Sequence, residues 1–438
     1  MNRTRSGPVA LRPLTAAVLF IVLPVACTGG GGTLVAPPSR APSVPAPKSP
    51  PPAVVIPKEL CQHAKPIPLP TGTASGPLPA PIQRVAGQVE GLRGIRFQHP
   101  VSPEAIGHEK LVSLLRSSLE QEFPAGMEAR REQAWIAMGA IPPGTDLRQA
   151  YFDYAGTQVI GFYDTLSHRL VFQGSSNPTP YQRMTLAHEL THALDDQAFG
   201  LGLLDRLVSS CQDEELLAFQ SLAEGDAVET QLRWAQQDLT VAEQLRLSQE
   251  AASFSPPPAS VPPFVKNLLV FPYTSGRLFV QALMARGGQR AVNDAFRNPP
   301  LSTEQIIHPE RYPNDVPARV PVPELKEKLG GPWQDLDMEP VGEAWLQTLL
   351  QLRVPSEVAY RAAAGWDGGL YRAWSLGPRT AVLMKTMWDT ERDAVDFART
   401  MATYGQGSLV SVRRIGQEVD VLFGTDPVAL EDLKRATG

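Results

Sequence analysis

Two histidines and a glutamate stand at a spacing that suits metal-assisted hydrolysis. Residues 186–193 read Leu-Ala-His-Glu-Leu-Thr-His-Ala. In a helix, His188 and His192 are one turn apart, about 6 Å along the axis, so both imidazoles can reach one ion. Glu189 points to the adjoining face, where its carboxylate can take a proton from a metal-bound water without being a ligand. The pattern predicts a zinc site, because the alternative of two surface histidines on an amphipathic helix fits poorly with the apolar residues around the motif.

A hydrolytic zinc site needs a third protein ligand and one open position. Asp195 and Ala198 stand where a metzincin would have glycine and a third histidine, so that arrangement is excluded. A downstream helix predicted over 213–236 places Glu224 among small residues. Its Gly225 costs a helix about 1 kcal/mol relative to Ala, which is understandable if this helix approaches the histidine-bearing helix closely. Glu224 is the predicted third ligand; as the alternative, it is a solvated acid like its acidic neighbours.

These residues resemble the gluzincin branch of zinc metallopeptidases, in which a downstream glutamate completes the site. The sequence His-Glu-Leu-Thr-His-Ala at 188–193 is similar to the same segment of thermolysin-type enzymes, and Asp196 also has a counterpart there. The resemblance implies a zincin-like catalytic domain with a small β-sheet, general-base catalysis by Glu189 and peptide-bond hydrolysis. It implies that Zn²⁺ is held by His188, His192 and Glu224.

The resemblance is confined to residues 155–235 and departs from the family at one supporting position. Val228 stands where thermolysin-like proteins have an aspartate that supports a zinc histidine, so this support is unassigned. The rest of the chain is more similar to bacterial, often lipoprotein, members of the HExxH clan.

Substrate and transition state each need further groups. In zincins the strand before the active-site helix pairs with an extended substrate, and Arg169–Gln173 is in position to do so, or is an ordinary sheet strand. A donor opposite the metal would stabilise the developing oxyanion. The candidates are Tyr273 and His308, with a packed tyrosine and a helix start at residues 302–305 as the structural alternatives.

The pattern along the chain predicts a mainly helical α+β protein. Residues 158–173 read as a β-hairpin, and the helix of the two histidines should begin after Thr179, with Pro180 in its first turn, and end at Gly200. From about residue 354 a small C-terminal α+β module is expected to position substrate or to pack. Its predicted elements are a loop at 365–369, a strand at 380–388, a helix at 390–404, a hairpin over 409–423 and a final helix at 426–437.

The N-terminal residues predict export. Three arginines precede a short apolar run that ends at Cys27, which reads as a signal peptide with either ordinary cleavage or lipidation of Cys27. The proline-rich stretch that follows cannot fold and predicts an extended stalk. Cys61 and Cys211 could then form a disulfide, or stay as two free thiols. The predicted organisation is a signal segment at 1–27, a linker at 28–82, a metallopeptidase domain at 83–350 and a C-terminal subdomain at 351–438.

Composition narrows the function. The 438 residues carry 40 Lys+Arg against 45 Asp+Glu with no run of like charges, so nucleic acid is excluded as the expected partner. We predict an exported zinc metalloendopeptidase in the envelope, periplasm or extracellular space, acting on protein or peptide. The alternatives are an envelope scaffold with a structural zinc and a zinc amidase acting on cell-wall material.

Overall fold

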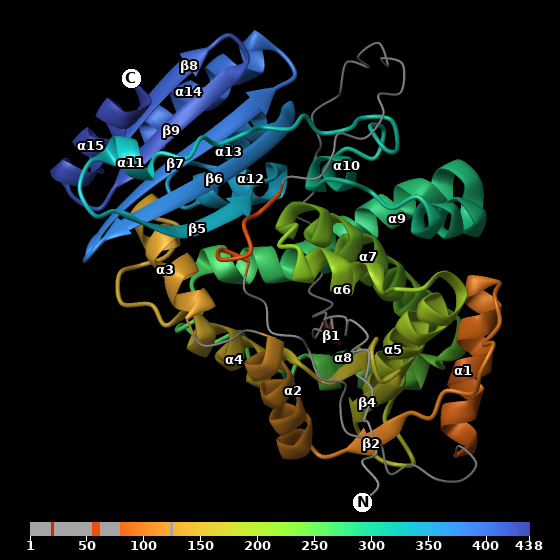
Figure 1. Cartoon of the computed structure of the whole chain (residues 1–438). Coiled ribbons are helices and arrows are strands. Elements are labelled where there is room, and N and C mark those ends of the chain that lie inside the picture. Colours follow the sequence, from red (N-terminus) through yellow and green to blue (C-terminus); the bar gives the residue numbers. More distant parts are fainter. Residues whose placement is uncertain (1–18, 22–54, 62–78, 123–125) are drawn as a thin grey trace, which may run out of the picture.

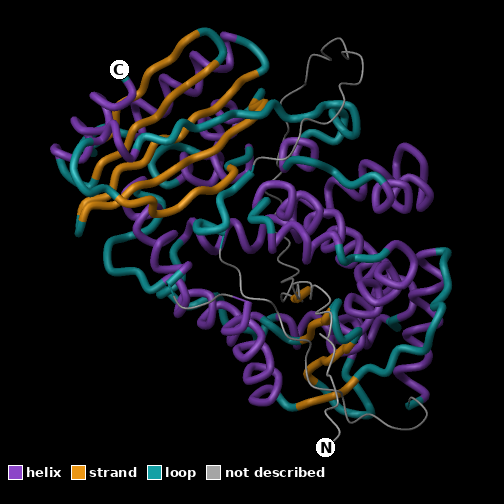
Figure 2. Tube along the Cα trace, in the orientation of Figure 1, coloured by secondary structure: helices purple, strands orange, loops and turns teal. Residues whose placement is uncertain are grey.

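The computed structural model describes residues 19–21, 55–61, 79–122 and 126–438 (Figure 1). The chain is an α+β protein with two β-sheets, and helices surround a small sheet at one end while a five-stranded sheet forms the other end (Figure 2). Cys27 and nearly all of the predicted signal and linker segments lie outside the described residues. The helices of the first part are α1 (Ala80–Arg93), α2 (His108–Glu122), α3 (Met127–Met138), α4 (Leu147–Gln158), α5 (Pro180–Phe199), α6 (Leu203–Ser209), α7 (Asp213–Asp238), α8 (Val241–Ala251), α9 (Pro263–Arg297) and α10 (Thr303–Ile307).

The small sheet has the order β1-β3-β4-β2. Its strands are β1 (Leu19–Ile21), β2 (Glu104–Ile106), β3 (Gly161–Asp164) and β4 (Arg169–Gln173). The predicted hairpin is confirmed, since β3 and β4 pair antiparallel through the turn at 165–168.

The expectation that β4 forms the edge of a cleft is wrong. β2 pairs with β4 in parallel on the side opposite β3, so the backbone hydrogen-bonding groups of β4 are used on both sides. The strand that takes a further partner is β3, on which β1 lies antiparallel with Phe20 opposite Tyr163.

Helix α5 begins and ends where its sequence predicts. The Thr179 hydroxyl accepts from the backbone N–H of Gln182, whose side chain accepts from the Thr179 N–H, and Pro180 occupies the first turn. Gly200 ends the helix with a positive φ of 78°. The residues from Met184 to Asp195 are all buried, because the first sheet and the neighbouring helices α1, α7 and α8 surround this helix.

Helix α7 crosses α9 at a pair of glycines. A Cβ added at Gly225 would lie well under 3.0 Å from the carbonyl group of Gly276, and one added at Gly276 would overlap the backbone of Ser221. The missing side chain of Gly225 therefore lets α7 approach α9, not α5 as the sequence suggested. The crossing brings Glu224 of α7 beside Tyr273 of α9, one turn before Gly276.

The second sheet is antiparallel throughout, in the order β5-β6-β7-β9-β8. Alternate residues of β7 face opposite sides of the sheet. Ala381 and Leu383 pack with Leu433 of the last helix. Val382 and Met384 pack on the other side, in a core that the helices at 343–404 share with α3 and α9. The elements are α11 (Lys326–Leu329), β5 (Gln334–Pro340), α12 (Glu343–Gln351), α13 (Ser356–Ala363), β6 (Trp366–Leu376), β7 (Arg379–Trp388), α14 (Glu391–Tyr404), β8 (Val410–Ile415), β9 (Glu418–Gly424) and α15 (Pro427–Thr437).

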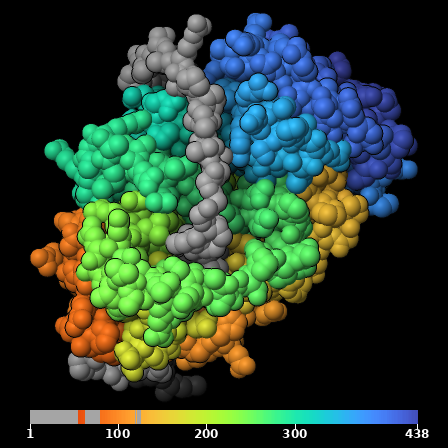
Figure 3. Space-filling model, turned by 180° about the vertical axis from the view of Figure 1, so that it is seen from behind, coloured from red at the N-terminus to blue at the C-terminus, as the bar shows by residue number. Residues whose placement is uncertain are grey.

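This module starts earlier in the chain than its sequence pattern shows. Strand β5, which precedes residue 351, pairs with β6 along the edge of the sheet. The predicted loop at 365–369 is wrong beyond its first residue, because Gly365 makes the turn with φ of 81° and β6 begins at Trp366. The module packs directly on the helical part, and the two share a border in the space-filling view (Figure 3).

A disulfide and a long apolar helix are two further features of the fold. Of the two alternatives that the sequence left open for Cys61 and Cys211, the structure has the disulfide, with a Cα–Cα distance of 5.8 Å. It holds residues 55–61 against the connection of α6 to α7. Among the described helices, α9 is long and apolar enough to cross a membrane, although it packs along α7 and its helical geometry is interrupted at Gly287 and Gly288.

Candidate metal centre

The three predicted ligands converge. The Glu224 Oε2 atom lies 3.1 Å from His188 Nε2 and 3.4 Å from His192 Nε2, and all three side chains have no solvent exposure. The centroids of the two imidazole rings are 4.7 Å apart and the rings are nearly perpendicular. This is expected for two side chains that lie one helical turn apart on α5 and point to one location. Helices α5 and α7 thus supply two nitrogens and one carboxylate oxygen to a single location.

The donor set fits a divalent cation. Gln231 Oε1 lies 3.0 Å from His188 Nδ1. In the tautomer that carries its proton on Nδ1 and donates it to this amide oxygen, the Nε2 lone pair of His188 faces the Glu224 oxygen. Two acceptors at this distance repel each other unless a positive charge lies between them. Ligand atoms bound about 2.0–2.1 Å from a tetrahedral zinc ion are about 3.3 Å apart, which matches the separations of Glu224 from both imidazoles.

The glutamate that lies between the two histidines in the sequence is fully buried. Both Glu189 carboxylate oxygens lack a hydrogen bond within the described part of the chain, and the side chain has no exposure. A buried carboxylate without a partner is costly, by several kcal/mol, so such a group calls for a functional explanation. A Cβ at Gly161 would lie 3.1 Å from Glu189 Oε1, which places the first residue of β3 beside this carboxylate.

Burial sets the protonation states of the centre. It lowers the pKa of His192 to about 4, so the imidazole is neutral at pH 7 and its lone pair is available for a metal. Burial would raise the pKa of Glu224, but the nearby histidines outweigh it and hold the value at about 2, so Glu224 stays ionised. Burial and the Glu224 charge together raise the pKa of Glu189 well above its ordinary value.

The two oxyanion candidates lie in different places. The Tyr273 hydroxyl donates to Glu224 Oε1 at 2.8 Å, and the centroid of the Tyr273 ring lies 6.3 Å from that of the stacked His188 ring. Tyr273 therefore belongs to the centre and orients the Glu224 carboxylate. His308 instead contacts Glu343 Oε1 at 3.0 Å from its Nε2 atom. The structure therefore brings Tyr273, but not His308, into contact with the predicted ligands.

A second group of carboxylates surrounds an arginine. Among the described residues, Glu304, Asp315 and Asp389 also place oxygens close together. The Arg311 Nη1 atom lies 3.1 Å from the nearest oxygen of Glu304, 2.5 Å from that of Asp315 and 2.7 Å from that of Asp389. A guanidinium therefore occupies the place that a metal ion would take among these carboxylates.

Two residues that support the centre were not identified from the sequence. Gln231 orients His188 and fills the supporting role that Val228 could not. It lies seven residues after Glu224, two helical turns along the same face of α7, so helical periodicity alone could have identified it. Arg93, at the end of α1, gave no such signal, because its partners are distant in sequence.

Arg93 joins the two helices that carry the ligands. Its Nη2 atom lies 2.6 Å from Asp195 Oδ1 on α5 and its Nε atom 2.8 Å from Asp226 Oδ2 on α7, and all three side chains are buried. Asp195 follows His192 by three residues, and Asp226 follows Glu224 by two. The buried guanidinium thereby fixes the relative position of the ligand-bearing segments.

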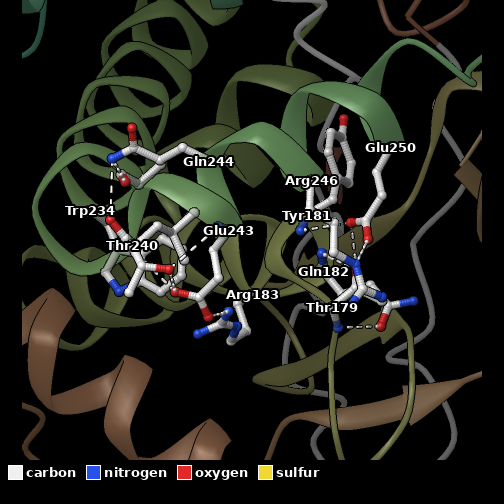
Figure 4. Close-up of polar contacts among 12 residues, drawn as sticks. Thr179, Tyr181, Gln182, Arg183, Trp234, Thr240, Glu243, Gln244, Arg246 and Glu250 are labelled. Carbon is white, nitrogen blue, oxygen red and sulfur yellow. Dashed lines mark hydrogen bonds and ion pairs between the residues drawn. The ribbon is translucent and has the colours of Figure 1, made fainter.

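The start of α5 is held by α8 (Figure 4). Glu250 Oε2 accepts from the Thr179 hydroxyl at 2.8 Å and from the Tyr181 N–H at 3.1 Å, so a carboxylate satisfies donors at the positive end of the helix. Nearby, Arg183 pairs with Glu243 at 2.5 Å. These contacts fix the direction of α5 before it reaches His188.

Comparisons with known proteins match part of the C-terminal module to a family model. Residues 329–430 match a domain of unknown function, DUF8575, which covers most of the C-terminal module and none of the predicted ligands. A crystal structure described as a "putative hydrolase with a novel fold" from Chloroflexus aurantiacus is similar over 54% of this chain and 91% of its own, with 17% identity and a TM-score of 0.34, a likeness too weak to support an argument. No protein of curated function matches the chain.

Proposed function

We propose that the protein is a zinc-dependent endopeptidase, exported to the cell envelope or beyond, with a zincin-like catalytic domain. The observation that carries this proposal is the convergence of His188, His192 and Glu224 on one buried location. Beside the two histidines on α5 lies the Glu189 carboxylate, which has no hydrogen-bond partner among the described residues. When bound, zinc would supply an acidified water and polarise the carbonyl of the bond to be cleaved.

The residues of the chain supply proton transfer and positioning. Glu189 takes the proton of the attacking water and returns it to the leaving nitrogen, which is the role of a carboxylate next to the metal that binds no metal itself. Gln231 keeps the Nδ1 proton of His188 in place, so that Nε2 remains a ligand, and Tyr273 fixes the Glu224 carboxylate. A structural zinc site would need neither Glu189 nor an open position.

The pairing of β1 with β3 supports a peptide as the substrate. Strand β3 holds Leu19–Ile21 antiparallel, with Ile21 opposite Phe162. A peptide that continues in this register past Ile21 reaches Gly161, which lies beside Glu189. The side of β3 on which β1 lies can therefore hold an extended chain and direct it toward the general base.

The test combines metal content with cleavage by the purified full-length protein. We expect one zinc per chain, cleavage of casein and peptides, and a loss of at least about 100-fold in Glu189→Gln with zinc retained. Glu224→Gln should lose zinc, whereas Glu215→Gln on the same helix should keep both zinc and activity. Zinc binding without Glu189-dependent cleavage would support the scaffold instead, and cleavage of muropeptides but not proteins would support the amidase.

A further inference from the structure

A cavity of about 270 Å³ lies between the helical part and the C-terminal module. Its walls come mainly from α3, α4, α7 and α9 on one side, and from the end of β5 and the start of α12 on the other. The described residues that line it include none of His188, Glu189, His192 or Glu224. The cavity is therefore separate from the candidate metal centre, and its own lining decides what it can hold.

Most of the lining is apolar. Leu217 and Leu269 contribute hydrocarbon surface from α7 and α9, and the rings of Tyr154, Tyr273 and Trp345 contribute aromatic surface. An apolar cavity of roughly 150 Å³ is enough to hold benzene, so this one has room for an aromatic ring with a few further heavy atoms. The body of a ligand should therefore be apolar.

The carboxylates at the wall already have partners. There are four of them, and their partners are Arg148 for Glu128, Arg131 for Asp213, Thr303 for Glu214 and Trp135 for Glu339. A cationic ligand would bring hydrogen-bond donors to acceptors that are already used, and an anionic ligand would be repelled by the carboxylates. The lining therefore disfavours a charged ligand.

Two hydrogen-bond donors at the wall lack a partner. The Nε1 atom of Trp345 and the Nη2 atom of Arg131 are buried, and neither forms a hydrogen bond within the described part of the chain. Both residues line the cavity, and Trp345 is only 3% exposed. A buried donor without a partner is unfavourable, and an oxygen supplied by a ligand would satisfy it.

We propose that the cavity binds a small uncharged molecule that combines an apolar body with a hydrogen-bond-accepting oxygen, such as a ketone, an ester or an amide. Its oxygen accepts from the Trp345 indole, and Arg131 offers a second donor. Because Trp345 belongs to α12 and Tyr273 to α9, the ligand contacts both the C-terminal module and the helical part. The inference is independent of the proposed peptidase function, since binding can be measured without zinc and without cleavage.

The first measurement compares four probes of similar size by NMR titration of the full-length protein. Acetophenone carries the accepting oxygen, 2-phenylpropene has a CH₂ group in its place, benzoate is anionic and benzamidine is cationic. We expect acetophenone to bind with a Kd of about 1 mM or lower, and both charged probes to bind at least about tenfold more weakly. Absence of acetophenone binding, or equal binding of either charged probe, would overturn the inference.

The second measurement tests the hydrogen bond. Trp345→Phe removes the donor and should weaken binding of acetophenone by about five- to tenfold relative to 2-phenylpropene. Trp333→Phe is the matched control and should leave this ratio unchanged. The Nε1 atom of Trp333 is also buried without a partner among the described residues, but Trp333 is not part of the described lining.

A third variant tests the location. Leu217→Trp should fill the cavity and abolish binding of acetophenone and of 2-phenylpropene, with the circular dichroism spectrum unchanged. A probe ratio that Trp345→Phe leaves as in the wild type contradicts the proposed contact. Acetophenone binding that persists in folded Leu217→Trp contradicts the proposed site.

Discussion

A methyl group at the crossing of α7 and α9 should disrupt the centre from outside it. In Gly225→Ala, the new Cβ would overlap the carbonyl of Gly276 and lie 2.8 Å from the N atom of Arg277, whereas ordinary contacts begin at 3.4 Å. Both obstacles are backbone atoms, so the helices must separate by about 1 Å. Such overpacking costs about 1–3 kcal/mol, which the better helix propensity of Ala offsets by at most about 1 kcal/mol.

The same separation acts on the proposed metal ligands. Glu224 precedes Gly225, and Tyr273 lies one turn before Gly276, so moving the helices apart lengthens the 2.8 Å hydrogen bond between them. Loss of such supporting contacts typically weakens metal binding by about 10- to 100-fold. Urea unfolding and zinc competition with a chelating dye measure the two effects on the same sample.

A second Gly→Ala substitution, at an uncrowded helical position, separates the effect of steric crowding from that of helix propensity. Gly91 of α1 has no atom within 4 Å of an added Cβ, so Gly91→Ala should stabilise the protein by about 0.5–1 kcal/mol and leave zinc affinity unchanged. If Gly225→Ala also stabilises the protein and binds zinc as the wild type does, the crossing does not position Glu224, and the reasoning fails.

Three further changes test the surrounding structure. Arg93→Ala leaves two buried aspartates without a counterion and should lower the free energy of unfolding in urea by about 3–5 kcal/mol. Arg96→Ala, whose side chain is 86% exposed, should lower it by about 0.5 kcal/mol or less. Equal losses in the two variants would contradict the role of Arg93 in joining α5 and α7. Cys211→Ser opens a cross-link that spans 150 residues and should lower unfolding free energy by about 2–4 kcal/mol, a difference that vanishes if wild type is measured with reductant. Burial raises the pKa of Glu214 from 4.5 to about 7, so the folded state binds this proton more tightly and stability should fall as pH rises from about 4.5 to 7; Glu214→Gln should flatten this slope, and an unchanged slope would refute the assignment.

The sequence predicted the parts of the centre that depend on local rules. Helical spacing places His188 and His192 on one face, and the signals at Thr179 and Gly200 mark both ends of α5 as observed. Glu224 was predicted from its helix and from the donor set that zinc requires, and the structure brings it to the histidines. These inferences hold because each depends on short stretches of chain or on the chemistry of one ion.

The parts that could not be predicted depend on contacts between distant segments. Arg93 lies 102 residues before Asp195, and no local pattern links them. Gly225 signalled a close approach, but only the fold identifies α9 as the helix that approaches. Strand β2 comes from residues that lack a clear strand pattern, and its pairing with β4 decides that β3, not β4, is left to bind a further strand.

The disulfide also determines how a pulling force on the N-terminal segment would be transmitted through the protein. Tension applied to residues before Cys61 is transmitted across the covalent bridge to Cys211, at the entrance of α7, and not along residues 62–210. The segment from α1 through α5, which includes Arg93 and both histidines, is thus mechanically shielded. In an anchored copy of the protein the load would enter at α7, which carries Glu224, while the disulfide is oxidised, and reduction would transfer the load to α1.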